Sequence, residues 1–156
     1  MRDKTKGPVQ SEKIMRRTIL LTSIVLFVCS LTQKCYCTTN QCGDAIMALL
    51  VGWLGLAYGG AALTWLANPV LWISWIFIKK NARLSFLCSI LSPLICVTFL
   101  LFNKVIDDEA GHYNKITGYK TGYWLWLASS LVMCTGNLLL NISNKGMNRI
   151  SGRLLI

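Results

Sequence analysis

The sequence predicts an all-α membrane protein, a helical bundle made of an N-terminal signal or anchor helix and three transmembrane helices. Three observations predict this fold class. Only 14% of the 156 residues are charged and 54% are hydrophobic, whereas average soluble domains are about 25% charged. The mean hydropathy is +0.50. The apolar residues form runs of about the length that a helix needs to cross a bilayer.

The net charge of +10 comes from 16 Lys and Arg against 6 Asp and Glu. A basic balance is also found in nucleic-acid-binding proteins, but no recognition motif or basic-aromatic surface accompanies it here. The basic residues cluster beside the apolar runs, which is typical of the cytoplasmic flanks of membrane helices. We therefore expect the lipid bilayer, and not nucleic acid, as the partner of this charge.

The chain begins with a basic segment and a short apolar run. Residues 1–17 are polar and end in Arg16-Arg17, which predicts a cytoplasmic N-terminus. Residues 18–32 are uncharged, but they are shorter than the roughly 17 to 25 residues of a spanning helix. A cleaved signal peptide and a retained signal-anchor helix therefore both stay open, and residues 33–156 form the helical membrane domain.

A short polar loop is expected over residues 33–43, and it contains Cys35, Cys37 and Cys42. In an oxidising compartment we expect one disulfide, formed by Cys42 with either Cys37 or Cys35, and one remaining thiol. A structural zinc site needs four ligands, and no fourth ligand lies nearby in the sequence. We therefore expect no metal at these cysteines.

The next stretch, residues 44–78, is uncharged after its first residue. As one helix it would reach roughly 50 Å, against about 30 Å of hydrocarbon, so it is too long for one straight span. Proline disfavours helix in the residue before it, which predicts a break at Asn68-Pro69. The expected arrangement is a span over residues 45–66, followed by a Trp-rich interfacial segment over residues 70–78.

Two further runs, residues 84–102 and 122–140, each have the length of one span. If residues 44–78 cross once, most Lys and Arg fall on the inner side, whereas two crossings divide them almost evenly. The positive-inside rule therefore predicts one crossing and a cytoplasmic C-terminus. A proline-kinked continuation and a re-entrant hairpin at Gly59-Gly60 are the alternative geometries.

Two groups of residues are candidates for helix packing. Gly55-x-x-x-Gly59, together with Gly52, predicts a face of small residues that allows another helix to approach closely. Packing within the chain, homo-oligomer formation and docking on a larger membrane protein all fit this face. Asn137 is expected to donate an interhelical hydrogen bond. The expected spans contain no ionisable residue other than cysteine, which argues against an ion-coupled transporter.

The polar segment 103–121 is expected to be an outer loop. Its candidate functional residues are Asp107, Asp108, Glu109, His112 and Tyr113. Glu109-x-x-His112 has the spacing of a carboxylate-bridged metal motif, but such sites need a second copy, and the chain has one histidine. No phosphate loop or other catalytic motif is present, so we expect no catalytic residue, cofactor or metal.

Two blocks of the sequence carry a resemblance. GWLGLAYGGAALTWLANP (52–69) and DDEAGHYNKITGYKTGYWLWLASS (107–130) resemble the paired WLANP and ITGYxxGYWLWL blocks of a set of small, uncharacterised bacterial multi-span membrane proteins. The resemblance covers about the latter two-thirds of the chain. It implies a bacterial envelope protein and no particular activity.

The expected function is therefore non-catalytic. We expect a small inner-membrane protein that acts through helix packing with itself or with a larger partner. A small channel-like or transport-accessory protein is the second hypothesis, and a membrane enzyme that uses the 103–121 loop is the third.

Overall fold

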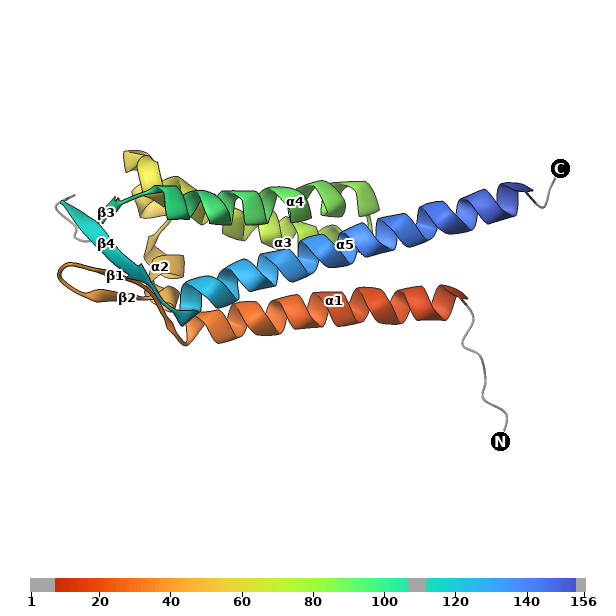
Figure 1. Cartoon of the computed structure of the whole chain (residues 1–156), viewed down its shortest axis with the longest axis horizontal. Coiled ribbons are helices and arrows are strands. Elements are labelled where there is room, and N and C mark those ends of the chain that lie inside the picture. Colours follow the sequence, from red (N-terminus) through yellow and green to blue (C-terminus); the bar gives the residue numbers. More distant parts are fainter. Residues whose placement is uncertain (1–7, 107–111, 154–156) are drawn as a thin grey trace, which may run out of the picture.

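The computed structural model describes residues 8–106 and 112–153 of the chain. Long helices lie side by side as a bundle, and a four-stranded sheet covers one end of it, here called the sheet end (Figure 1). The fold is mostly helical, as predicted. It is not purely all-α, because the sheet forms from segments that were expected to be loops.

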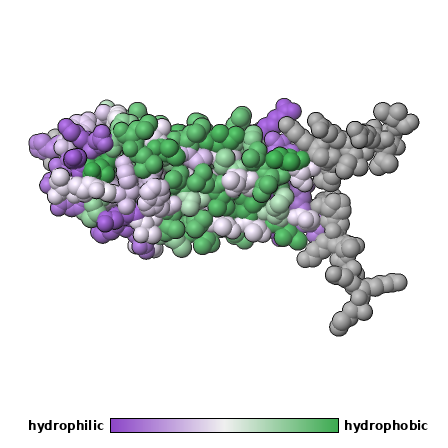
Figure 2. All heavy atoms as spheres, in the orientation of Figure 1, coloured by the Kyte–Doolittle hydropathy of each residue, from purple (hydrophilic) through white to green (hydrophobic). Residues whose placement is uncertain are grey.

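Four helices of the described chain are long and apolar enough to cross a membrane. They are α1 (Pro8–Leu31), the continuous pair η2 (Gly60–Leu66) and α3 (Ala67–Phe77), α4 (Ala82–Thr98) with the short η3 (Phe99–Leu101), and α5 (Thr121–Arg153). Apolar side chains cover the middle of the bundle, and hydrophilic side chains gather at the sheet end (Figure 2). This distribution is that of a membrane protein.

The sheet joins two segments that are distant in the sequence. Its strands are β1 (Lys34–Thr38), β2 (Cys42–Asp44), β3 (Lys104–Ile106) and β4 (Tyr113–Tyr119), in the order β2-β1-β4-β3. All neighbouring strands are antiparallel. Both segments lie at the same end of the bundle, and pairing satisfies their backbone N–H and C=O groups. The expectation of two separate loops is therefore wrong.

The long apolar stretch is broken at Gly59-Gly60, and the expected break at Asn68-Pro69 is wrong. Gly59 and Gly60 have φ angles of +69° and +61°, a backbone conformation that glycine adopts without a steric penalty. Helix runs without interruption from η2 into α3 through Asn68 and Pro69. The glycine pair, which the sequence suggested only as the site of a re-entrant hairpin, is the point where the chain turns.

A side chain of the neighbouring residue explains why Pro69 does not break the helix. Proline has no N–H, so the carbonyl four residues earlier, that of Trp65, lacks its usual donor. The Asn68 side chain replaces it, because Nδ2 donates to the Trp65 carbonyl at 3.0 Å. The change from 3-10 to α-helix occurs at this same place.

The surplus length of the stretch lies before the turn and not after it. The short helices α2 (Ala45–Val51) and η1 (Leu54–Tyr58) stay at the sheet end (Figure 1), and the candidate span is Gly60–Phe77. Residues 70–78, which were expected at the membrane interface, belong mostly to α3, where Leu71 and Ser74 are fully buried. The stretch crosses the bundle once.

Small polar side chains join the helices in the body of the bundle. Between α1 and α5, Ser23 Oγ donates to the Ser129 carbonyl at 2.9 Å, and Ser129 Oγ donates to the Ser23 carbonyl at 2.8 Å. Ser74 of α3 and Ser85 of α4 form the same reciprocal pair, both at 2.9 Å. Serine is small enough to let helix backbones approach, and its hydroxyl bonds across the gap.

The end opposite the sheet brings α1 and α3 together. Arg16 Nη1 donates to the Ile78 carbonyl at 2.6 Å, and its guanidinium also pairs with Glu12 at 2.6 Å. A cation at a helix C-terminus is stabilised by the helix dipole. The basic residues of the first half of α1, Lys13, Arg16 and Arg17, and the Lys79-Lys80 pair after α3 therefore lie at the same end of the bundle.

Candidate ligand-binding cavity

A cavity of about 580 Å³ lies between the sheet and the bundle. Its lining comes from the ends of α1 and α5, from the sheet, from α2 and η1, and from η2 and the start of α3. Small-molecule sites in proteins typically measure about 300 to 1,000 Å³. The cavity therefore has the size of a ligand site, and its lining comes from residues 27–68, 99–106 and 113–126, which meet at the sheet end.

The floor of the cavity is formed by Phe27, Asn68 and Trp126, one residue from each of three helices. Trp126 Nε1 donates to Asn68 Oδ1 at 2.9 Å, and the side-chain nitrogen of Asn68 donates to the Trp65 carbonyl. Among the described residues, no buried side-chain nitrogen or oxygen lacks a hydrogen-bond partner. The polar atoms of the floor are thus already satisfied, and the floor offers a ligand mainly aromatic and aliphatic surface.

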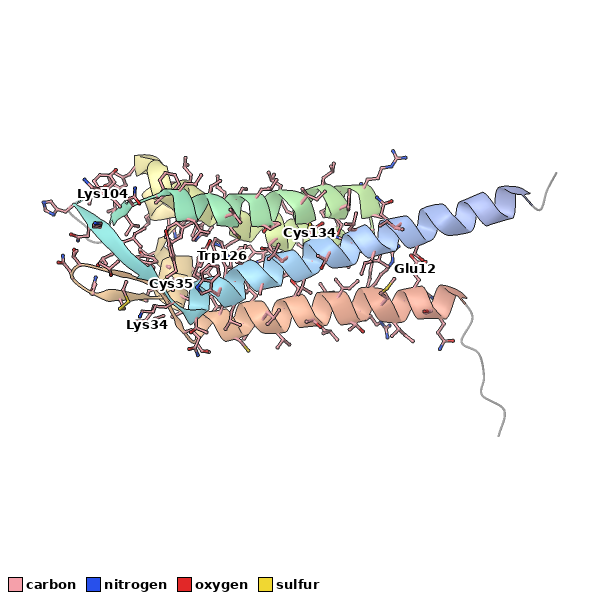
Figure 3. All side chains as sticks on the ribbon, viewed as in Figure 1. Glu12, Lys34, Cys35, Lys104, Trp126 and Cys134 are labelled. Carbon is pink, nitrogen blue, oxygen red and sulfur yellow. A yellow bond between two sulfur atoms is a disulfide. The ribbon has the colours of Figure 1, made fainter. Side chains whose placement is uncertain are left out.

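The roof of the cavity is the β1–β2 hairpin. Cys35 lies there, at the sheet end of the bundle (Figure 3). Its thiol donates to the Gly43 carbonyl at 3.2 Å. Burial raises the pKa of Cys35 to about 11, so the thiol is neutral near pH 7. A neutral thiol is a poor nucleophile. The roof also contains Asp44, whose carboxylate forms an ion pair with Lys34 at 2.7 Å.

One side of the cavity is closed by α2 and η1, here called the α2–η1 wall. Trp65 of η2 holds this wall, because its Nε1 donates to the Leu49 carbonyl at 2.9 Å. Several wall residues line the cavity and are also exposed on the outside of the molecule: Met47, Val51, Leu54 and Tyr58. These residues form the rim of the opening on this side, and this part of the rim is therefore apolar, whereas the exposed lining residues Gln41 and Asp44 lie on the side of the hairpin.

The predicted small-residue face is used inside the chain. A Cβ added at Gly52 would lie 2.6 Å from the Trp65 ring, and one added at Gly55 would lie 2.9 Å from Ala62 Cβ. Both contacts join the α2–η1 wall to η2, so these glycines lie outside the candidate spans themselves and pack within the chain against the start of the span Gly60–Phe77. Gly59 has no neighbour within 4 Å at its Cβ position and is the turn itself.

The cysteines and Asn137 have separate places in the structure. Cys37 and Cys42 form a disulfide across the β1–β2 hairpin, and Cys35 is a free thiol. Cys35 and Cys37 both face the buried side of β1, since residues two apart in a strand share a face. Asn137 lies in the body of the bundle, away from the cavity, where Nδ2 donates to Ser85 Oγ of α4 at 3.0 Å.

The structure describes only some of the candidate functional residues of the segment 103–121. Asp107, Asp108 and Glu109 lie outside the described residues. His112 is exposed, and Tyr113 is an exposed residue that lines the cavity. Within residues 8–106 and 112–153, no group of three His, Cys, Asp or Glu side chains lies close enough to hold a metal ion.

Sequence reasoning missed the aromatic residues of the cavity. From the sequence, no site role was assigned to Tyr123 or Trp126, yet both line the cavity, and the Tyr123 hydroxyl donates to the Cys96 carbonyl at 3.1 Å. Their spacing of three residues, followed by the buried Leu127, places them on one face of α5. This spacing could have identified the inward face.

Comparisons of the chain with protein-family models, with curated proteins and with solved structures found no match. The resemblance to bacterial multi-span membrane proteins therefore stays a prediction, and the cavity geometry is the main guide to function.

Proposed function

We propose that this chain is a non-catalytic integral membrane protein that binds a small, largely apolar molecule in the cavity under its sheet. The observation that carries the proposal is the cavity itself: a volume of about 580 Å³ with an apolar rim along the α2–η1 wall and a floor whose polar atoms are already paired. Ligand sites are typically apolar clefts with a few fixed polar groups.

The membrane in this proposal is the bacterial inner membrane, with the sheet end outside and the C-terminus in the cytoplasm. The basic residues of the first half of α1, Lys13, Arg16 and Arg17, and those of the α3–α4 connection share the end opposite the sheet, which supports a cytoplasmic position for that end. The Cys37–Cys42 disulfide supports an oxidising compartment for the sheet. The reciprocal Ser23–Ser129 bonds favour a retained α1 over a cleaved signal peptide.

Binding is favoured over the other functions that the sequence allowed. Leu71, Ile78 and Met133 are almost completely buried below the floor, which favours a closed bundle over a conducting one. The neutral thiol of Cys35 and the paired carboxylate of Asp44 favour a binding site over a catalytic one. Gly52 and Gly55 are occupied by contacts within the chain, so the proposal no longer depends on helix packing with a partner.

A fluorescent apolar probe, 1-aminoanthracene, tests the proposal. The full chain in lipid nanodiscs should show a saturable fluorescence increase above the linear partition measured with empty nanodiscs. Ala48 lines the cavity and Ala57 of the same wall does not, so Ala48→Phe should weaken saturable binding by about tenfold. Ala57→Phe is the matched control and should bind like the unchanged chain. Linear partition alone with the unchanged chain would reject the proposal.

A further inference from the structure

We propose further that the molecule held in the cavity is one acyl chain of a bilayer phospholipid, which enters sideways past the α2–η1 wall. This inference rests on the proposed function and names its ligand. Three independent features of the sheet end support it: the outer surface of the wall, the depth of the cavity and the hydrogen bonding of its lining.

The outer surface of the α2–η1 wall is suited to lipid and not to water. Six large apolar side chains of this short segment are between 46% and 61% exposed: Ile46, Met47, Leu50, Val51, Trp53 and Leu54. In water, such a continuous apolar patch marks an interaction surface or an aggregation hazard. An apolar segment with Trp53 and Tyr58 at one end of a bundle fits the boundary between headgroups and acyl chains.

The cavity extends from this boundary into the depth of the spans. Its floor residues Phe27, Asn68 and Trp126 belong to the candidate spans 10–31, 60–77 and 121–143. Its roof, the β1–β2 hairpin, lies beyond the end of α1. The opening beside the α2–η1 wall is therefore at the level of the outermost part of the acyl chains, and the apolar rim faces them.

The chemistry of the lining selects a hydrocarbon chain. A polar ligand atom placed against the floor would find its partners already bonded to each other, and burying it without a hydrogen bond costs about 1 to 3 kcal/mol on protein scales. A hydrocarbon chain has no polar atoms and therefore needs no hydrogen-bond partner at the floor. Polar cavity residues, Gln41 and Asp44 among them, lie at the roof, where a headgroup would remain.

The energetic reason for occupancy is packing and not the hydrophobic effect. Lipid tails are as apolar as leucine, so moving a tail from the bilayer into the cavity removes no surface from water. An empty apolar cavity, however, forfeits the dispersion contacts of its lining atoms, and an entering chain restores them. Bilayer lipid is always adjacent to the rim, so it occupies the cavity unless a better ligand displaces it.

The test uses the full chain in nanodiscs that contain a phosphatidylglycerol with a photoreactive diazirine near the end of one acyl chain. After irradiation, mass spectrometry should find adducts on the floor at Phe27 and Trp126. Adducts should also occur at Leu87, an exposed residue of α4 outside the cavity, which serves as an internal reference for ordinary lipid contact.

The cavity-filling pair of variants then assigns the floor adducts. Ala48→Phe should lower labelling of Phe27 and Trp126 by about tenfold, relative to Leu87 in the same sample. Ala57→Phe should leave both unchanged. If Ala48→Phe fails to fold, the labelling of Phe27 and Trp126 relative to Leu87 in the unchanged chain still tests whether an acyl chain enters the cavity.

Three outcomes would overturn the inference. Adducts at Leu87 with none on the floor would mean that no acyl chain enters the cavity. If 1-aminoanthracene still binds saturably in that case, the proposed function stands and the ligand is a different apolar molecule; if it does not, both proposals fail. Displacement of the floor label by an equimolar isoprenoid alcohol, with the Leu87 label unchanged, would assign the cavity to isoprenoid chains.

Discussion

The body of the bundle and its sheet end are built from the same helices but packed differently, and the cavity lies at the sheet end. In the body, α1 and α5 approach so closely that a Cβ on Gly136 would lie 2.5 Å from the Ile19 side chain. Under the sheet, the same helices present Phe27 and Trp126 to the cavity. Small side chains close the space between helices, and large aromatic ones hold it open.

Backbone geometry adds to this difference. In the body, α1, α3, α4 and α5 are all α-helices, whereas η2 beside the cavity is a 3-10 helix that begins at the Gly59-Gly60 turn. Seven residues of 3-10 helix rise about 14 Å, a length for which an α-helix uses about nine residues. Fewer side chains are therefore available per unit length to fill the space beside η2. Open space in a bundle thus follows from helix type as well as from residue size.

The largest expected effect comes from forcing the body of the bundle apart. Gly136→Leu should destabilise the protein by about 3 kcal/mol, the upper end of the usual range for overpacking, because the new side chain would clash with the Ile19 side chain. Unfolding in mixed micelles titrated with sodium dodecyl sulfate measures this change. Gly118→Ala is the control, since its Cβ would meet nothing within 4 Å. A neutral Gly136→Leu would mean that α1 and α5 are not in close contact.

The floor of the cavity should be next in sensitivity. Asn68→Leu removes the acceptor of Trp126 Nε1 and the side-chain donor of the Trp65 carbonyl, which also accepts a backbone N–H at the end of η2. Unsatisfied buried groups cost about 1 to 3 kcal/mol each, and we expect a loss of about 2 kcal/mol. Pro69→Ala in the same chain supplies a new backbone N–H to the Trp65 carbonyl and should recover part of the loss. Absence of any recovery would contradict the role assigned to Asn68.

A substitution at the Gly59-Gly60 turn, which separates the two regions, should destabilise the fold through backbone strain and not through a steric clash. Gly59 has φ +69° and ψ −153°, a combination that residues with a side chain essentially do not adopt. Gly59→Ala should therefore destabilise the fold by about 1 to 2 kcal/mol, although its Cβ has no neighbour. The same detergent titration measures it, and an effect as small as that of Gly118→Ala would argue against the turn.

Single hydrogen bonds in the body should matter less. Asn137→Ala removes donors to Ser85 and Ser74, and interhelical hydrogen bonds in membranes average about 0.6 kcal/mol. The reciprocal bonds between Ser74 and Ser85 persist in this variant and limit the loss. A loss above about 2 kcal/mol would show that these residues act as one cooperative network.

The smallest expected effect is on the chemical reactivity of the Cys35 thiol, which is measured in the folded protein without changing the fold. Burial raises the pKa of Cys35 to about 11, so its thiolate is scarce below that pH. Alkylation of Cys35 by iodoacetamide, followed by site-resolved mass spectrometry, should rise about tenfold per pH unit from pH 8 to 10 without a plateau. The unfolded chain should level off near pH 8.5 to 9. A plateau at that pH in the folded chain would mean that the roof of the cavity is open to water.

Composition and residue patterning predicted the membrane environment, the helical bundle and the single crossing of residues 44–78. The position of the break in that stretch was mispredicted, because the rule for the residue before proline takes no account of the Asn68 side chain. The missing N–H of Pro69 is replaced by that side chain, and no periodicity in the sequence reveals the replacement. Gly59-Gly60 was considered as the site of a re-entrant hairpin, but nothing in the local sequence favoured it over Asn68-Pro69 as the position of the break.

The sheet and the cavity could not be predicted from local sequence patterns, for a different reason. Burial alternates along much of β1 and β4 in the structure, but their sequences, KCYCT and YNKITGY, lack the regular apolar-polar alternation that would identify a half-buried strand in advance. Their pairing exists because the helices bring both segments to one end of the bundle. The cavity in turn depends on that pairing, so its residues could be predicted singly, as glycines or aromatics, but not as one site.

The pairing of β1 with β4 also sets an order of events during synthesis. Thr117 Oγ1 of β4 donates to the Cys37 carbonyl across a separation of 80 residues. At about 5 to 20 residues per second, β4 is translated roughly 4 to 16 s after β1. The β1–β2 hairpin is local and can close during this interval, but the edge of β1 has no partner until α3 and α4 have been made. A nascent chain thus carries an exposed strand edge for seconds, and a ribosome that pauses within α4 prolongs that exposure.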